Sequence, residues 1–254
     1  MVIRDRKKAG QVTLFIILAI IIVASILVFF LYLQPNFFSV KSEKLYLESC
    51  VEGIIQDSIN KLSLTAGNSD PSFNAQYLGE NISIVCYSDE YYKPCVVQQA
   101  SFKQTFEESL AKETKTQIEK CYKDSVRELQ AKGYEVTEGN IKQTFEINPD
   151  GVKVTVNAPT TVSSGEVNSR QEKFEIKYNS DIYKILMIAT SILQYETSYG
   201  DSEVSTFMYL YPELNVQKIR SNDGIKIYII TDKNVIEFKF AVRSYAWPPG
   251  YGVS

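Results

Sequence analysis

A run of apolar residues near the start of the chain constrains the fold more than any other feature. Residues 12–33, VTLFIILAIIIVASILVFFLYL, contain no charged side chain. As an α-helix with a rise of about 1.5 Å per residue, this run matches the roughly 30 Å hydrocarbon core of a bilayer. A helix from a soluble core would show a polar face, which this run lacks. We therefore predict a transmembrane helix over residues 12–34.

The charges that flank this run predict its orientation. Four basic residues precede it, Arg4, Arg6, Lys7 and Lys8. No basic residue follows it until Lys41. By the positive-inside rule, residues 1–11 form a cytoplasmic basic head, and the chain from residue 35 onward lies outside. The expected location is the cell membrane, crossed once, with the lipid bilayer as a partner.

The end of the apolar run argues against a cleaved signal peptide. The run is longer than the usual apolar part of a signal peptide, and its exit, LYLQPNFFSV, has no small-residue cleavage site. Gln34 and Pro35 instead have the character of a helix stop, because proline disfavours helix in the residue before it. The apolar segment is therefore expected to stay part of the protein, without cleavage at this exit.

The cysteines support an outside location. All four follow the apolar run: Cys50, Cys86, Cys95 and Cys121. An even number of cysteines in an exported segment is typical of disulfides. Pairing Cys86 with Cys95 would close a short loop and pairing Cys50 with Cys121 would join two helices, but the sequence permits three connectivities. Zinc is disfavoured because the chain has no C-x-x-C pair and no histidine, and no metal or cofactor is predicted.

Hydrophobic periodicity after residue 35 predicts an α+β fold. Apolar residues at helical spacing indicate amphipathic helices over 40–62 and 99–132, and a largely apolar helix over 181–195. Alternating apolar residues indicate a hairpin that turns at Asn148-Pro149-Asp150-Gly151. Further strands are expected at 174–178, 225–232 and 235–243. Residues 204–214 fit a short helix or a strand that Pro212 interrupts.

These elements suggest three parts outside the membrane. Residues 35–133 are expected to form a helical, cysteine-bearing lobe, and residues 134–245 an antiparallel sheet of about five or six strands. The helix over 181–195 is expected to cover one face of that sheet. Residues 246–254, AWPPGYGVS, are expected to form a loose tail.

No residue pattern predicts a catalytic centre. The absence of histidine removes the commonest general base, and both the phosphate-binding glycine loop and the G-x-S-x-G motif are missing. A Ser-Lys dyad could join Ser163, Ser164 or Ser169 to Lys173, but a polar hairpin loop explains these residues better. No catalytic residue is assigned, and a non-enzymatic role is favoured.

Several features are typical of binding rather than catalysis. The 17 tyrosines and 13 phenylalanines provide large contact area, which favours recognition of a surface protein or a glycan. The net charge of −3 argues against nucleic acid. Asp89 and Glu90 could contact a sugar or Ca²⁺, although two adjacent acids are too few for a calcium loop. Asn81 begins an N-x-S sequon and is a glycosylation candidate. Nothing indicates an oligomeric state.

The segment KKAGQVTLFIILAIII resembles the leader of archaeal type IV pilin-like proteins. The resemblance implies cleavage after Gly10, which would leave Gln11 as the first residue of a filament subunit. The chain departs from that pattern at Phe15, where many pilins carry glutamate, and at Pro35, which interrupts a helix that pilins usually continue. Ala9 also replaces a frequently basic residue.

The opening GQVTLFI, followed by YLESCVEGIIQDSI, is also similar to uncharacterised single-pass surface proteins of small-genome archaea. That resemblance implies no activity. The expected function is a membrane-anchored extracytoplasmic protein for cell-surface interaction or envelope structure. The alternatives are a pilin-like subunit processed after Gly10 and a membrane-anchored exported hydrolase.

Overall fold

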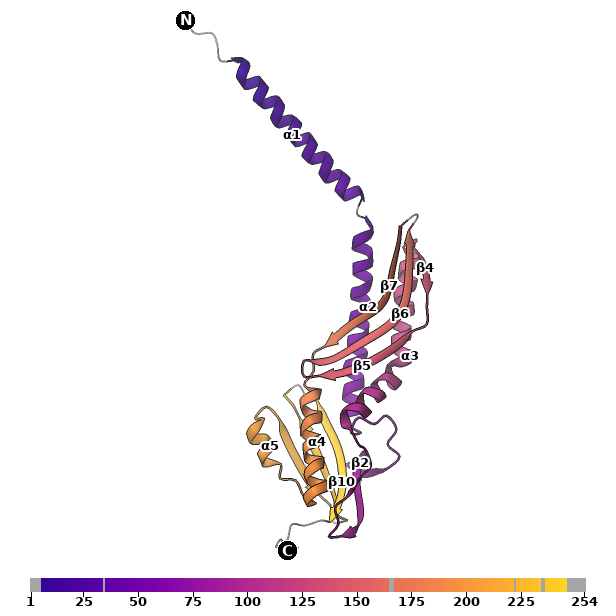
Figure 1. Cartoon of the computed structure of the whole chain (residues 1–254), viewed down its shortest axis with the longest axis vertical. Helices are drawn as coiled ribbons and strands as arrows, with labels where there is room; N and C mark the ends of the chain where they lie inside the picture. Colours follow the sequence, from indigo (N-terminus) through magenta and orange to yellow (C-terminus); the bar gives the residue numbers. More distant parts are fainter. Residues whose placement is uncertain (1–5, 34, 165–166, 222, 234–235, 246–254) are drawn as a thin grey trace. The chain divides into compact units, whose positions relative to one another are not determined.

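The computed structural model describes residues 6–33, 35–164, 167–221, 223–233 and 236–245 (Figure 1). The expected tail, residues 246–254, and Gln34 lie outside the described residues, as do the first five residues of the basic head. The chain divides into two compact units, Met1–Tyr46 and Leu47–Ser254. Each unit is described by itself.

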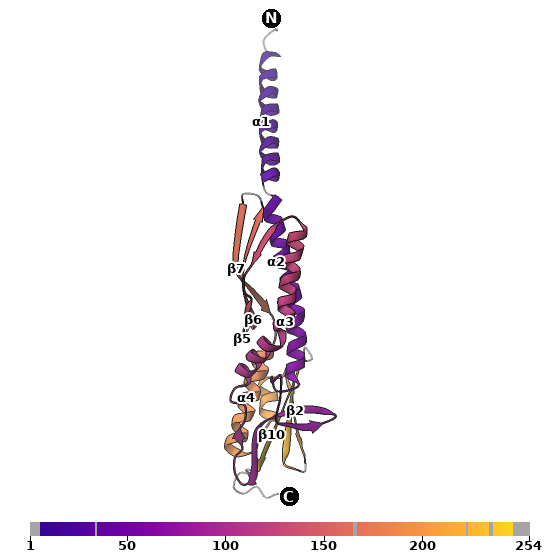
Figure 2. The same ribbon diagram turned by 90° about the vertical axis from the view of Figure 1, so that its right-hand side faces the viewer.

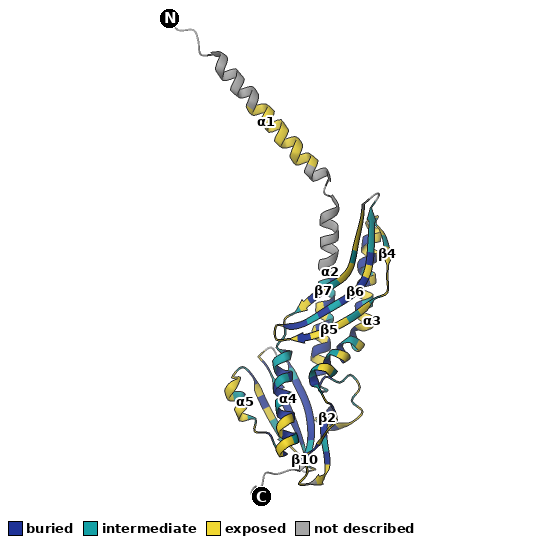
Figure 3. Cartoon of the chain, viewed as in Figure 1, coloured by how far each residue is buried: buried dark blue, intermediate teal, exposed yellow. Residues whose placement is uncertain are grey.

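The first unit contains the apolar run within helix α1 (Arg6–Leu33). All its described side chains, residues 16–29, are exposed (Figure 3), and the large apolar ones are 50–63% exposed. The next helix, α2 (Pro35–Ser63), begins at Pro35, because a proline at the first helical position loses no hydrogen bond. Of the helices searched over the described residues, none has both the length and the hydropathy needed to cross a bilayer.

The second unit is α+β, as predicted, and two long helices line its core. These are the part of α2 from Leu47 onward and α3 (Phe102–Ala131), which Figure 2 shows side by side. A disulfide joins them through Cys50 and Cys121. Each helix buries one apolar stripe at a spacing of three or four residues, the signature of an amphipathic helix. The stripe of α2 comprises Leu47, Val51, Ile55, Ile59 and Leu62.

One sheet of this unit has six strands. Its strands are β1 (Asn74–Tyr77), β2 (Glu80–Tyr91), β3 (Val96–Val97), β8 (Asn215–Arg220), β9 (Ile225–Thr231) and β10 (Glu237–Tyr245). Their order is β1-β2-β10-β9-β8, with β3 also paired to β2. Strand β10 runs parallel to β2, with Ala241 opposite Ile84, and the other pairs are antiparallel. This sheet is therefore mixed rather than purely antiparallel.

The second sheet has four antiparallel strands. They are β4 (Glu135–Glu138), β5 (Lys142–Asn148), β6 (Gly151–Ser164) and β7 (Val167–Tyr178). Strand β6 pairs with all three of the others. The predicted hairpin is confirmed, because Asn148 pairs with Gly151 across a two-residue turn. Along β6, the buried residues Val152, Val154, Val156 and Ala158 alternate with less buried residues, so one face of this sheet meets the core.

Gly151 meets a steric requirement at the start of β6. Its φ is 126°, and a Cβ atom there would overlap the carbonyl oxygen of Tyr178. We expect Gly151→Ala to lower the free energy of unfolding by about 1–3 kcal/mol, because the strained backbone and the overlap both oppose the substitution. Urea denaturation followed by circular dichroism measures this change.

Gly53 provides the matched control. It lies in α2, and nothing lies within 4 Å of the Cβ that alanine would add. Gly53→Ala should therefore raise the free energy of unfolding by about 0.5–1 kcal/mol through helix propensity. Equal effects at the two positions would contradict the packing described at Gly151.

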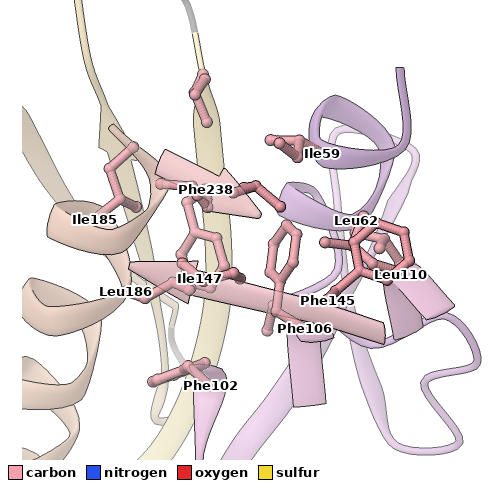
Figure 4. Close-up of a cluster of buried hydrophobic side chains, with 14 of the residues drawn as sticks. Ile59, Leu62, Phe102, Phe106, Leu110, Phe145, Ile147, Ile185, Leu186 and Phe238 are labelled. Atoms are coloured by element: carbon pink, nitrogen blue, oxygen red, sulfur yellow. The ribbon is translucent and has the colours of Figure 1, made fainter. Parts of the chain in front are cut away.

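Helices α4 (Ile182–Tyr199) and α5 (Ser205–Leu210) complete the second unit. The buried face of α4 packs against β9, β10 and the end of β5. Figure 4 shows side chains from α2, α3, α4, β5 and β10 meeting in one apolar cluster. Phe102 and Phe238 lie edge to face there, with ring centroids 5.5 Å apart. The two sheets and the helices thus share a core.

The observed strand partners differ from the expected division into a helical lobe and a separate sheet. Strands β1–β3 fall within residues 35–133, but β2 lies beside β10, which belongs to residues 134–245. A smaller apolar cluster, which includes Ile82 and Ile227, joins these segments further. The reason for the difference is that local periodicity identifies a strand but not its distant partner.

Candidate functional site

Helices α4 and α5 border a groove with a volume of about 750 Å³. This volume lies within the range of small-molecule sites. Residues spaced four apart along α4, in a row that winds gradually around the helix, line the groove: Tyr183, Met187, Ser191, Tyr195 and Tyr199. The α5 side contributes Phe207, Leu210 and Tyr211. The groove therefore follows α4 for most of its length.

The aromatic rings in the groove remain accessible. Tyr195 is 50% exposed, Tyr199 is 58% exposed and Tyr211 is 38% exposed. The rings of Tyr195 and Tyr199 are tilted against each other, with their centroids 5.9 Å apart. Because tyrosine combines an apolar ring with a polar tip, such a surface can contact apolar, cationic and hydrogen-bonding ligand groups.

Carboxylates are placed at both ends of the groove. Near the start of α4, the Lys184 ammonium lies 2.8 Å from Glu213 Oε1 and 3.7 Å from Asp181 Oδ1. The hydrogen bond with Glu213 raises the pKa of Lys184, and the same bond lowers the pKa of Glu213. The positive charge of Lys233 also lowers the pKa of Glu213, so two ammonium groups act at this end.

Glu203 occupies the other end, in the connection between α4 and α5. Its Oε1 accepts a hydrogen bond of 3.0 Å from the backbone N–H of Ser205. This backbone bond lowers the pKa of Glu203, so the carboxylate is charged at neutral pH. The positive charge of Lys218 lowers the pKa of Glu203 further.

Asp201, beside Glu203, is neutralised by two cations from strand β8. Lys218 Nζ lies 3.1 Å from Asp201 Oδ1, and Arg220 Nη2 lies 2.7 Å from Asp201 Oδ2. Lys218 also donates to the carbonyl oxygen of Ser202 at 2.7 Å. These contacts tie the connection after α4 to the sheet edge and fix the position of the groove wall.

A buried ion pair lies beneath this wall. Glu196 of α4 is fully buried and pairs with Lys226 of β9, which also donates to the carbonyl oxygen of Gly200. Tyr228 donates its hydroxyl to Glu196, and the Ser202 N–H donates to the same carboxylate at 3.2 Å. Burial raises the pKa of Glu196, against the opposing effects of Lys226 and Tyr228. The pair anchors the last turn of α4, which carries Tyr195 and Tyr199.

The cysteines form two disulfides in the second unit. Cys50 is bonded to Cys121, and Cys86 is bonded to Cys95. Neither disulfide lines the groove. Their placement in the core and beside the sheet gives them a structural role.

The serines and the lysine considered for a dyad are not brought together. Ser163 faces Asn168 and Ser169 faces Val162 in the β6–β7 hairpin, whereas Lys173 lies opposite Asn157. Four residues of strand separate Ser169 from Lys173, a distance of about 13 Å. Ser164 faces Val167 at the end of the hairpin, still further away. These residues form no nucleophilic site.

The other predicted site residues lie at the surface. Asp89 and Glu90 are exposed at the end of β2, where Glu90 pairs with Lys93. Asn81 is exposed and accepts a hydrogen bond from Gln76. Glycosylation at Asn81 stays a prediction. Gly10 and Gln11 lie in α1, and their exposure falls outside the described residues. Within the described ranges, no group of three or more acidic or sulfur ligands could hold a metal ion.

The groove was not predicted from the sequence. The sequence predicted a largely apolar helix over 181–195 that covers a sheet, without a face reserved for binding. In the structure, Tyr183, Tyr195 and Tyr199 all line the groove. The available signal was the pair Tyr195 and Tyr199, because residues four apart are neighbours on a helix surface.

Comparison with known proteins gives no family for the chain. No family model matches it, and neither does any curated protein or solved structure. Its function must therefore be inferred from the groove, the disulfides and the apolar helix.

Proposed function

We propose that the protein is anchored in the cell membrane by α1 and exposes its disulfide-bonded unit outside, where the unit serves cell-surface interaction. The observation that carries this proposal is the apolar surface of α1. Residues 12–33 contain no charge, and the described side chains at 16–29 have no partner that removes them from solvent. So much exposed apolar surface is costly in water and favourable in lipid.

The disulfides and the groove support the external location and the binding role. Two disulfides indicate an oxidising compartment, and all four cysteines follow the apolar run. The groove offers accessible tyrosines and carboxylates, which are typical of recognition sites. Envelope structure without a specific partner would leave this groove unexplained.

Membrane anchorage is tested by extraction of membranes from cells that express the full chain. The protein should stay in the membrane pellet after an alkaline carbonate wash. A variant with Ile20→Arg and Ile22→Arg should be released, because each central charge opposes insertion by about 2.5–3.5 kcal/mol. Gln130→Arg with Asn157→Arg, at exposed positions of the second unit, is the control and should stay in the pellet. Release of the unaltered chain by carbonate would refute anchorage.

A pilin-like subunit is the second candidate, favoured by the basic residues and Gly10 that precede the apolar run. The two candidates differ in whether the Gly10–Gln11 peptide bond is cleaved. Intact-mass measurement of the protein from an archaeal host that has a prepilin peptidase decides between them. An uncut head supports the anchor, whereas a mature chain that starts at Gln11 supports the pilin-like subunit.

A further inference from the structure

The charges that line the groove between α4 and α5 are balanced. At one end, the Asp181 carboxylate lies 3.7 Å from the Lys184 ammonium. At the other end, Lys218 lies 3.1 Å from Asp201, and its positive charge also acts on Glu203. Neither a cationic nor an anionic ligand would meet an uncompensated charge here. Electrostatic complementarity therefore favours a neutral ligand.

Polar and apolar side chains alternate along one stripe of α4 in the groove. Residues that follow one another at three or four positions lie on the same side of a helix. In order, the stripe consists of Lys184, Ile188, Ser191 and Tyr195. Ser191 donates its hydroxyl to the carbonyl oxygen of Met187 at 3.0 Å, so its own lone pairs can accept from a ligand. A matching ligand presents apolar surface and hydrogen-bonding groups side by side.

Two accessible aromatic rings lie toward the end of α4. Tyr195 and Tyr199 are 50% and 58% exposed, and their ring planes meet at 34°. The buried pair of Glu196 and Lys226 holds the turn that carries them, so the rings are positioned before a ligand binds. The face of an aromatic ring is negative and attracts slightly positive C–H groups.

A saccharide meets these three conditions. A pyranose ring has an apolar face of C–H groups and a rim of hydroxyls that both donate and accept hydrogen bonds. In the groove, Lys184 can donate to such hydroxyls, and Ser191 and Glu203 can accept from them. An acyl chain would cover the same groups without replacing their hydrogen bonds to water. The groove walls are helices, which offer an extended peptide no strand edge for backbone pairing.

The length of the lining indicates more than one sugar. Lys184 and Tyr195 are eleven residues apart, which corresponds to about 16 Å of helix and exceeds the width of one pyranose ring. The volume of about 750 Å³ is within the range of ligand sites. A single sugar would contact only one part of this lining.

We propose that this groove binds a neutral oligosaccharide. One sugar ring packs against Tyr195 or Tyr199, and the following sugars extend along α4 toward Lys184. Their hydroxyls bond to Ser191 and to the charged groups at the two ends. This assignment rests on the proposed role in surface interaction and names the class of ligand.

A glycan array tests the proposal. The probe is the full chain in lipid nanodiscs, empty nanodiscs give the background, and the array carries neutral, acidic and basic oligosaccharides. Neutral oligosaccharides should bind above background. The affinity for the best of them should change by less than about twofold between about 0.05 and 0.5 M salt, because screening does not weaken contacts with an uncharged ligand.

Variants of the lining identify the groups that bind. Tyr195→Ala should lower the affinity for that oligosaccharide by about fivefold to tenfold, because an aromatic face is lost. Tyr195→Phe keeps the ring and should recover most of this loss. Ser191→Ala should lower the affinity by about threefold, and alanine suits the helix. Tyr209→Ala is the control and should leave affinity unchanged, since Tyr209 is 86% exposed on α5 but does not line the groove.

Five outcomes would overturn the proposal. Three concern the array and its variants: no oligosaccharide above background, binding of charged oligosaccharides alone, and equal affinity for the Tyr195→Ala variant. Selection of uncharged peptides from a display library, with no oligosaccharide bound, would reassign the groove to a protein segment. Oligosaccharide binding only after residues 246–254 are deleted would make those residues the occupant. Carbonate extraction is independent of all these results, so membrane anchorage can stand if the groove assignment fails.

Discussion

Glu196→Ala is expected to lower the free energy of unfolding by about 3–5 kcal/mol. The substitution leaves Lys226 without its carboxylate partner, and the Lys226 side chain is only 7% exposed. It also removes the acceptor of the Tyr228 hydroxyl and of the Ser202 N–H. A buried charge that has lost its partner is among the most destabilising defects in a folded protein. Urea denaturation of the full chain, followed by circular dichroism, measures the loss.

A triple variant separates the cost of the unpaired Lys226 charge from the net contribution of the ion pair to the free energy of unfolding. Glu196→Met, Lys226→Met and Tyr228→Phe together replace the polar groups by apolar ones of similar size. Its stability should lie within about 1 kcal/mol of the unaltered protein, since apolar replacement of a buried pair is often neutral. If the triple variant were as unstable as Glu196→Ala, the loss of the pair and of its hydrogen bonds with Ser202 and Gly200, rather than the unpaired Lys226 charge, would be responsible.

Removal of the disulfide between α2 and α3 should have the next largest effect. Cys50 and Cys121 are 71 residues apart, so the bond strongly reduces the conformational entropy of the unfolded chain. Replacing both by alanine is expected to lower the free energy of unfolding by about 4 kcal/mol. Denaturation of the variant and of the unaltered protein under non-reducing conditions gives the difference.

The Cys86–Cys95 bond provides the comparison. It closes a segment of only nine residues, and its removal should lower the free energy of unfolding by about 2.5 kcal/mol. A larger effect from the short loop than from the long one would show that native packing, rather than restriction of the unfolded chain, governs the stabilisation.

Local elements of the second unit were predictable from sequence, because each has a local cause. The stripe from Leu47 to Leu62 indicates a helix, and alternation on both sides of Asn148 to Gly151 indicates a hairpin. The two cysteine pairs were among the three connectivities that the sequence permits. Residues 204–214 were ambiguous, and they contain α5, which ends before Pro212.

The long-range arrangement was not predictable in the same way. The residues of β2 do not predict β10 as its parallel partner, because the pairing of Ile84 with Ala241 depends on how the intervening chain folds. The groove likewise depends on how distant segments fold together. Tyr195 and Tyr199 lie one turn apart wherever α4 is helical, but only the position of α5 makes that part of α4 one wall of a groove.

Lysine labelling of intact cells tests most directly whether the protein is anchored with its second unit outside. Lys61 and Lys93 have side chains that are 70% and 62% exposed in that unit, whereas Lys7 and Lys8 belong to the basic head. A membrane-impermeant amine reagent should modify Lys61 and Lys93 in sealed cells, and Lys7 and Lys8 only after permeabilisation. Protection of Lys61 and Lys93 until the cells are opened would contradict the proposed topology.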